Sequence, residues 1–138
     1  MKTTRSWLTA LALTSAALIP LSFYGAPQPL AATTFTPLTL QNGWTNAPFG
    51  TGNAAVRTIS GIVHLKGAIS TAGTNPVPFT LPSAFRPASV VFVPVDLCNA
   101  TNGRLQIEPT GVVTVEAEGG TFSNAACFTG LDGASFAP

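Results

Sequence analysis

Charged side chains are scarce in this 138-residue chain, where Asp, Glu, Lys and Arg together make up 8% of the residues. An average soluble domain has about 25%. Two of the six basic residues, Lys2 and Arg5, lie at the extreme N-terminus, so the remainder supplies no basic stripe of the kind that nucleic-acid binding needs. We therefore expect no nucleic-acid partner, and only weak long-range electrostatic attraction to any other partner.

Histidine and closely spaced cysteine are scarce too. His64 is the one histidine, and the two cysteines, Cys98 and Cys127, do not form a C-x-x-C motif. A zinc site takes three or four protein ligands, and a serine-type triad takes a nucleophile, a histidine and an orienting acid. The sequence therefore predicts no metal, no cofactor and no triad, and we expect His64 on the solvent face of a strand.

The N-terminal residues predict an export signal. Lys2 and Arg5 precede an uncharged, mostly apolar run over 7–19 that ends at Pro20. A run of about thirteen residues suits a signal peptide and is shorter than the roughly 20 residues that span a bilayer. We expect residues 1–32 to be a signal peptide and 33–138 to be one secreted domain without membrane association. The alternative is an uncleaved anchor.

Both cysteines, Cys98 and Cys127, lie in the part of the chain expected to be exported. An even number of cysteines in an oxidising compartment favours a disulfide. We therefore expect these two residues to be bridged, with a pair of buried free thiols as the alternative. Closing a loop of about 30 residues would stabilise the fold by roughly 3–4 kcal/mol in the entropic model.

Two hairpins are predicted from turn residues between β-prone runs. Ser60-Gly61 separates 54–59 from 62–69 as a tight turn. Within the second run Val63, Leu65 and Ile69 share one face, which is the alternation of a half-buried strand. Pro109-Thr110-Gly111 separates 104–108 from 112–117 in the same way.

The chain as a whole predicts an all-β fold. Thirteen Gly and twelve Pro indicate many turns, and we expect loops over 44–53, 96–103 and 118–124 around a buried strand at 90–95. No stretch has a 3.6-residue apolar period long enough for a helix. We predict an antiparallel, jelly-roll-like β-sandwich of about seven or eight strands, with its Phe residues mostly in the core.

Four short segments match known motifs in order and spacing. They are 61–67 as a G-x-V-x-L-x-G strand, 81–87 as an L-P-x-x-[FY]-R-P turn, 107–113 as an I-x-x-x-G-x-V hairpin, and 131–136 as an L-D-G-x-x-F strand. Together they resemble the C-terminal tip domains of bacteriophage tail fibres and related receptor-binding proteins. The resemblance implies a β-sandwich that often forms homotrimers and binds cell-surface receptors, commonly saccharides.

Two residues are candidates for ligand binding. Trp44 follows Asn42-Gly43 in a predicted loop, where its ring could stack on a sugar, and the alternative is that it caps the core. Arg86 could contact a ligand or a neighbouring subunit. Its alternative role is to satisfy backbone carbonyl groups of its own turn.

Glu116 and Glu118 are the candidates for acid–base chemistry. They share a face at strand spacing, and that separation is compatible with a glycosidase carboxylate pair. The strand runs into Gly119-Gly120, however, and exposed acids are what we expect at such a strand end. Ser135 lies in a segment without the final Gly of a G-x-S-x-G nucleophile turn. We therefore expect a protein that is not an enzyme.

The sequence thus predicts a secreted, non-catalytic, adhesin-like module for an extracellular or cell-surface glycan or protein. The alternative is a structural subunit of an extracellular β-rich assembly or filament, to which the β-prone arm 33–40 would add as an edge strand. Asn99-Ala100-Thr101 also fits the N-glycosylation sequon.

Overall fold

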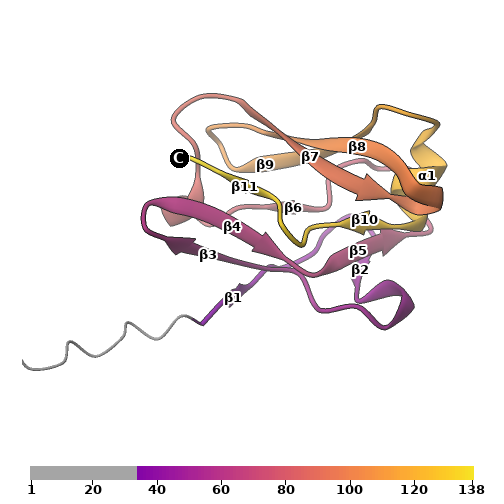
Figure 1. Ribbon diagram of the computed structural model, residues 1–138, viewed down its shortest axis with the longest axis horizontal. Coiled ribbons are helices and arrows are strands. Elements are labelled where there is room, and N and C mark those ends of the chain that lie inside the picture. The colour runs from indigo at the N-terminus through magenta and orange to yellow at the C-terminus, as the bar shows by residue number, and fades with distance from the viewer. Residues whose placement is uncertain (1–33) are drawn as a thin grey trace, which may run out of the picture. The chain divides into compact units, whose positions relative to one another are not determined.

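The computed structural model describes residues 34–138, so the predicted signal peptide at 1–32 lies outside the described residues. Two antiparallel sheets make up the fold (Figure 1). The smaller sheet has the order β1 (Thr36–Pro37), β3 (Ala55–Ile59), β4 (Ile62–Lys66) and β11 (Ser135–Phe136). The larger has the order β2 (Trp44–Asn46), β5 (Ala68–Thr71), β10 (Thr129–Gly130), β7 (Val91–Leu97), β8 (Thr101–Ile107), β9 (Val112–Ala117) and β6 (Phe79–Thr80).

The predicted all-β antiparallel sandwich is confirmed. Every paired strand in the described part is antiparallel. Four of the strands, β1, β6, β10 and β11, have two residues each, and the longer ones agree with the expected seven or eight. In Figure 1 the β7–β8–β9 layer lies above and the β3–β4 hairpin lies below.

Both predicted hairpins are present. At the β3–β4 turn, Ser60 and Gly61 have φ of 49° and 81°, as a two-residue turn with both central residues in the left-handed region requires. Ile59 and Ile62 are the last paired residues before it. At the β8–β9 turn, the Gly111 N–H donates to the Glu108 carbonyl at 2.8 Å.

The predicted strand at 62–69 is divided at Gly67, where the chain passes from the smaller sheet to the larger one. Gly67 has a φ of 91°, and a Cβ there would lie 2.3 Å from the carbonyl oxygen of Asn53. No other residue fits so close to another backbone. The Gly67 N–H donates to Asp132 Oδ1 at 2.9 Å, so the crossing is also tied to the C-terminal segment.

Three loop predictions are wrong in detail. The segment 96–103 holds the end of β7, a 3₁₀ turn at Cys98–Ala100 and the start of β8. The segment 44–53 begins with β2 and contains a 3₁₀ turn at Pro48–Gly50. Outside the three predicted loops, a further 3₁₀ turn covers Ser83–Phe85. A short helix, α1 (Phe122–Cys127), begins in the third predicted loop.

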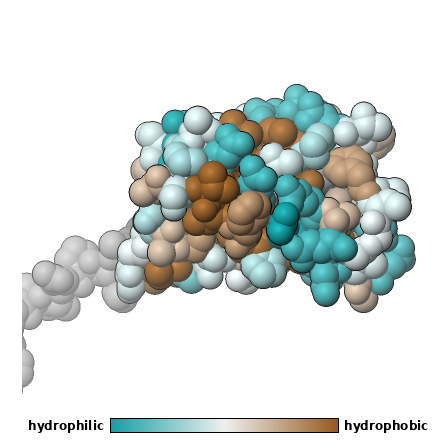
Figure 2. All heavy atoms as spheres, turned by 90° about the horizontal axis from the view of Figure 1, so that it is seen from above, coloured by the Kyte–Doolittle hydropathy of each residue, from teal (hydrophilic) through white to brown (hydrophobic). Residues whose placement is uncertain are grey.

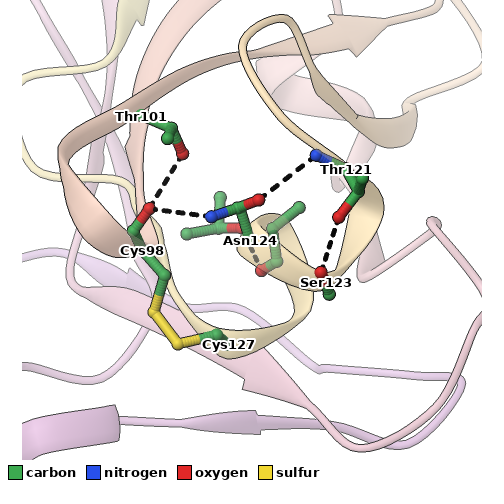
Figure 3. The surroundings of a disulfide bond; sticks show 8 residues. Cys98, Thr101, Thr121, Ser123, Asn124 and Cys127 are labelled. Atoms are coloured by element: carbon green, nitrogen blue, oxygen red, sulfur yellow. Dashed lines mark hydrogen bonds between the residues drawn. A yellow bond between two sulfur atoms is a disulfide. The ribbon is translucent and has the colours of Figure 1, made fainter.

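Helix α1 depends on its caps rather than on an apolar period, which is why the sequence pattern did not predict it. The Thr121 N–H donates to Asn124 Oδ1 at 3.2 Å, which satisfies a backbone donor at the N-terminus. The other end of the Asn124 amide donates to the Cys98 carbonyl at 3.2 Å (Figure 3). One side chain therefore ties the helix start to the turn that precedes β8.

The predicted Cys98–Cys127 disulfide is confirmed (Figure 3). It joins the 3₁₀ turn after β7 to the last residue of α1, across a Cα–Cα distance of 5.8 Å. The Thr101 hydroxyl donates to the Cys98 carbonyl at 2.8 Å and tightens the same turn. Bridge and hydrogen bonds together anchor α1 at the end of the larger sheet.

The core lies between the inner faces of the two sheets. Its most deeply buried large side chains come from both sheets and from the C-terminal segment: Val56, Val63, Ile69, Phe79, Leu81, Leu97, Leu105, Ile107, Val113, Val115 and Leu131. The expectation of buried Phe holds for Phe79 and Phe136, whereas Phe49 and Phe92 are 79% and 53% exposed. Among residues 34–138, no helix has the length and apolar character to cross a membrane.

Removing the bridge with C98A/C127A should lower the free energy of unfolding by about 2–4 kcal/mol, since the unfolded chain regains loop entropy. Urea denaturation of the oxidised protein and of the variant measures this difference. Reductant should lower the stability of the parent protein to that of the variant and leave the variant unchanged. Equal stabilities of variant and oxidised parent would contradict the role given to the bridge.

Candidate functional site

Alternation along β7, β8 and β9 separates a buried inner face from an exposed outer face. Val93, Leu105 and Val115 are paired neighbours that point into the core, so the residues between them point outward. We call this outer surface the β7–β9 face. Its side chains are Phe92, Pro94, Asp96, Asn102, Arg104, Gln106, Thr114 and Glu116, with Val90 and Glu118 at its margins.

One end of the β7–β9 face is apolar. Val90 and Phe92 are 46% and 53% exposed, and both are large apolar side chains that the fold leaves in water. Figure 2, which looks down on the molecule from above, shows apolar spheres next to a strongly hydrophilic area. An exposed apolar group with a polar rim is typical of a contact surface.

Arg104 organises the middle of this face. Its Nε donates to Glu116 Oε2 at 2.5 Å, and its Nη1 lies 3.5 Å from Glu118 Oε1. The guanidinium carbon also lies 4.6 Å from the ring centroid of Phe92, in range for a cation–π contact. One guanidinium thus fixes two carboxylates and an aromatic ring in a defined arrangement.

A shallow pocket of about 450 Å³ adjoins this cluster. Its polar side chains are Asp96, Asn102, Glu118 and Asp132, and its remaining lining residues are Pro94, Val95, Gly103, Gly133 and Ala134. Because Asp132 accepts a hydrogen bond from Gly67 at the sheet crossing, this pocket wall is fixed by the fold. The pocket offers carboxylate acceptors and an amide that both donates and accepts.

Trp44 does not reach this site. It starts β2, is 5% exposed, and donates its indole N–H to the Asn75 carbonyl at 2.9 Å. Its ring meets Phe122 of α1 edge to face, with the centroids 6.4 Å apart. In this conformation Trp44 caps the core and offers no open face for a sugar.

Arg86 also lies apart from the β7–β9 face. Its Nε donates to the Leu81 carbonyl at 2.9 Å, which is the alternative role considered above. A Cβ on Gly111 would lie 2.6 Å from that same Nε. Arg86 therefore links the turn after β6 to the β8–β9 turn, while much of its side chain stays exposed.

The candidate catalytic residues lie on two different sheets. Glu116 and Glu118 both face the guanidinium of Arg104, which holds them in ion pairs. His64 lies on the outer side of β4, directly opposite Ser135 of β11 and Arg57 of β3. Within residues 34–138, no group of three or more His, Cys, Asp or Glu side chains is placed to hold a metal ion.

Sequence reasoning found Glu116 and Glu118 but missed the partners that make them part of a site. Phe92 lies in an almost wholly apolar run, which indicated burial on both sides. The signal that could have identified it is the alternation of three Val residues with Phe92, Pro94 and Asp96. No local sequence pattern identifies Arg104 and Asn102 as site residues, because the side chains that lie beside them are determined by the register of the paired strands.

Gly111→Ala should lower the free energy of unfolding by more than about 2 kcal/mol, because it adds a clash with Arg86 and Leu81 to a positive φ. Gly133→Ala is the matched control, since Gly133 has a φ of 83° and open space around its Cβ. Its cost should be about 1 kcal/mol. Thermal and urea unfolding measure both variants, and equal costs would contradict a close Arg86 contact.

Phe92→Ser should cost less than about 1 kcal/mol of stability, because the side chain is half exposed. Phe79→Ala, at a fully buried position, should cost about 3–5 kcal/mol. Urea denaturation of the two variants gives the comparison. A loss for F92S as large as that for F79A would mean that Phe92 serves the fold rather than a contact.

No protein-family model, curated protein or solved structure shows a significant match to this chain. The resemblance to phage tail-fibre tip domains therefore rests on the four sequence motifs alone.

Proposed function

We propose that this protein is a secreted, non-catalytic, adhesin-like module that binds an extracellular or cell-surface ligand through the β7–β9 face and its pocket. One observation carries the proposal. The chain has five acidic residues, and four of them, Asp96, Glu116, Glu118 and Asp132, gather at this face and pocket beside an exposed Phe92.

Stability does not account for that gathering. Like charges placed close together repel and destabilise the folded chain, and ion pairs as exposed as those of Arg104 contribute about 0–1 kcal/mol. Leaving Phe92 half exposed forgoes further apolar burial. Groups that the fold gains little from are best explained by contact with a ligand.

A saccharide suits this combination of groups. A sugar ring has an apolar face of C–H groups, which an exposed aromatic ring can cover, and a rim of hydroxyl groups. The carboxylates of Asp96 and Glu118 accept hydrogen bonds from hydroxyl groups, and the Asn102 amide both donates and accepts. A pocket of about 450 Å³ lies within the usual range for small-ligand sites. The fibre-tip motifs imply the same class of ligand.

The proposal also includes that the protein is exported and that it does not turn over its ligand. The disulfide suits an oxidising compartment, and the N-terminal charge and apolar run suit a signal peptide. Glu116 and Glu118 share one guanidinium, an arrangement that orients carboxylates for hydrogen bonding. We therefore assign them to ligand contact rather than to general acid–base catalysis.

A glycan array probed with the protein purified after expression of the full chain tests this proposal. We expect binding to at least one glycan or cell-wall saccharide, weakened about tenfold or more by Phe92→Ser and by Glu118→Gln. Glu108→Gln is the matched control, because Glu108 lies at the β8–β9 turn outside the pocket, and it should bind like the parent.

Two results would overturn the proposal. One is folded protein that binds no glycan and no cell-wall extract. The other is turnover of a bound glycan that Glu116→Gln or His64→Ala abolishes, which would make the protein a hydrolase.

A further inference from the structure

The outer side of the smaller sheet is basic. Arg57 and His64 are paired neighbours on β3 and β4, and Lys66 lies one outward position along β4. The guanidinium carbon of Arg57 and the ammonium of Lys66 lie 4.4 Å and 5.4 Å from the ring centroid of Phe35. We call this surface, made of Phe35, Arg57, Ile59, Ile62, His64 and Lys66, the β3–β4 face.

The two outer faces carry formal charges of opposite sign. On the β7–β9 face, Asp96, Glu116 and Glu118 stand against Arg104, which gives −2, and Glu108 adds a negative charge at the margin, where it follows Gln106 beside the β8–β9 turn. On the β3–β4 face, Arg57 and Lys66 give +2 with His64 neutral, and the strands forming it contain no acidic residue. The low net charge of the chain therefore conceals two complementary surfaces.

Apolar side chains accompany the charges on both faces. Ile62 is 37% exposed beside the β3–β4 turn, while Val90 and Phe92 are exposed on the opposite face. These are three of the four exposed large apolar residues in the described part of the chain. Each face thus combines an apolar end with a charged middle, as protein contact surfaces do.

We propose that the β7–β9 face also docks the β3–β4 face of a second copy of this chain. The two faces have opposite charges and each has an apolar end, so the β3–β4 face of one copy is complementary to the β7–β9 face of another. The two faces lie on opposite outer sides of the sandwich (Figure 1), so the contact joins different surfaces of the two copies. Such a contact leaves one free face on each partner and repeats into an open filament rather than a closed dimer.

This inference goes beyond the proposed function and makes a neighbouring copy a competitor of the saccharide. A copy seated on Phe92 and Glu118 covers the mouth of the pocket. In a filament, only the terminal copy leaves its β7–β9 face free for a ligand. A glycan that binds the pocket should therefore shorten the filaments.

Light scattering on the purified protein, over a range of concentrations, gives the first test. The mean mass should rise continuously with protein concentration and fall between low and high salt, because exposed charges are screened. A monomeric mass at every concentration would overturn the inference, as would a fixed mass of two or three copies.

Two single charge reversals give the sharper test, because each damages one face and spares the other. Lys66→Glu and Glu118→Lys change exposed residues and should each raise the concentration needed for association about tenfold or more. Mixed at equal amounts, they should associate more strongly than either variant alone, since each copy supplies one intact face and the two reversed side chains are again opposite in charge. Glu108→Lys makes the same charge change at the margin of this face, beside the β8–β9 turn, and should weaken association less than Glu118→Lys does.

Unchanged association of either reversed variant would contradict the assigned faces, and so would a mixture that stays monomeric. Thermal unfolding of each variant confirms that the compared proteins are folded. The Lys66→Glu variant also separates this inference from the saccharide proposal, since its β7–β9 face is intact and its glycan binding should persist. Association without glycan binding in the parent would overturn the saccharide proposal alone.

Discussion

The close approach of Gly67 to the Asn53 carbonyl is the contact on which the rest of the structure depends. It allows β4 of one sheet to continue as β5 of the other within a single residue. At the same point the Gly67 N–H binds Asp132 and its carbonyl accepts from the Leu131 N–H at 2.8 Å. The crossing that makes the sandwich therefore also fixes the C-terminal segment that walls the pocket.

Because the chain has few charged residues, the positions of those few largely determine the electrostatic character of its surface. In a typical domain they are spread over the surface and favour solubility. Here most of them lie on two surfaces of opposite sign, and Arg104 joins two carboxylates to an exposed aromatic ring. The proposed recognition and the proposed self-association both depend on this separation, because both use directed contacts rather than the weak overall field of the chain.

Local patterns predicted the parts of the fold that local physics determines. The alternation of Val63 and Leu65, the Ser60-Gly61 turn and the cysteine pair are each specified by a few adjacent residues or by compartment, and all three are present. Helix α1 was missed, because an Asn124 cap and a disulfide stabilise it in place of an apolar period.

The candidate site was harder to predict, because its residues come from separate strands and from a distant segment of the chain. Asp96, Asn102 and Glu118 meet only after strands β7, β8 and β9 have paired in register, and Asp132 joins them from a distant segment. Trp44 stood out by residue type, yet it lies in the core. Residue chemistry alone therefore identified Glu116 and Glu118, but neither the other two acids of the site nor the surface to which they belong.

The central claim is that recognition takes place on the β7–β9 face. Backbone amide chemical shifts, recorded by NMR as a bound glycan is added to dilute, monomeric protein, test it most directly. We expect the largest shift changes to fall on Phe92, Asn102, Arg104 and Glu118. Changes confined to other surfaces, such as the exposed Phe49 loop, would contradict it.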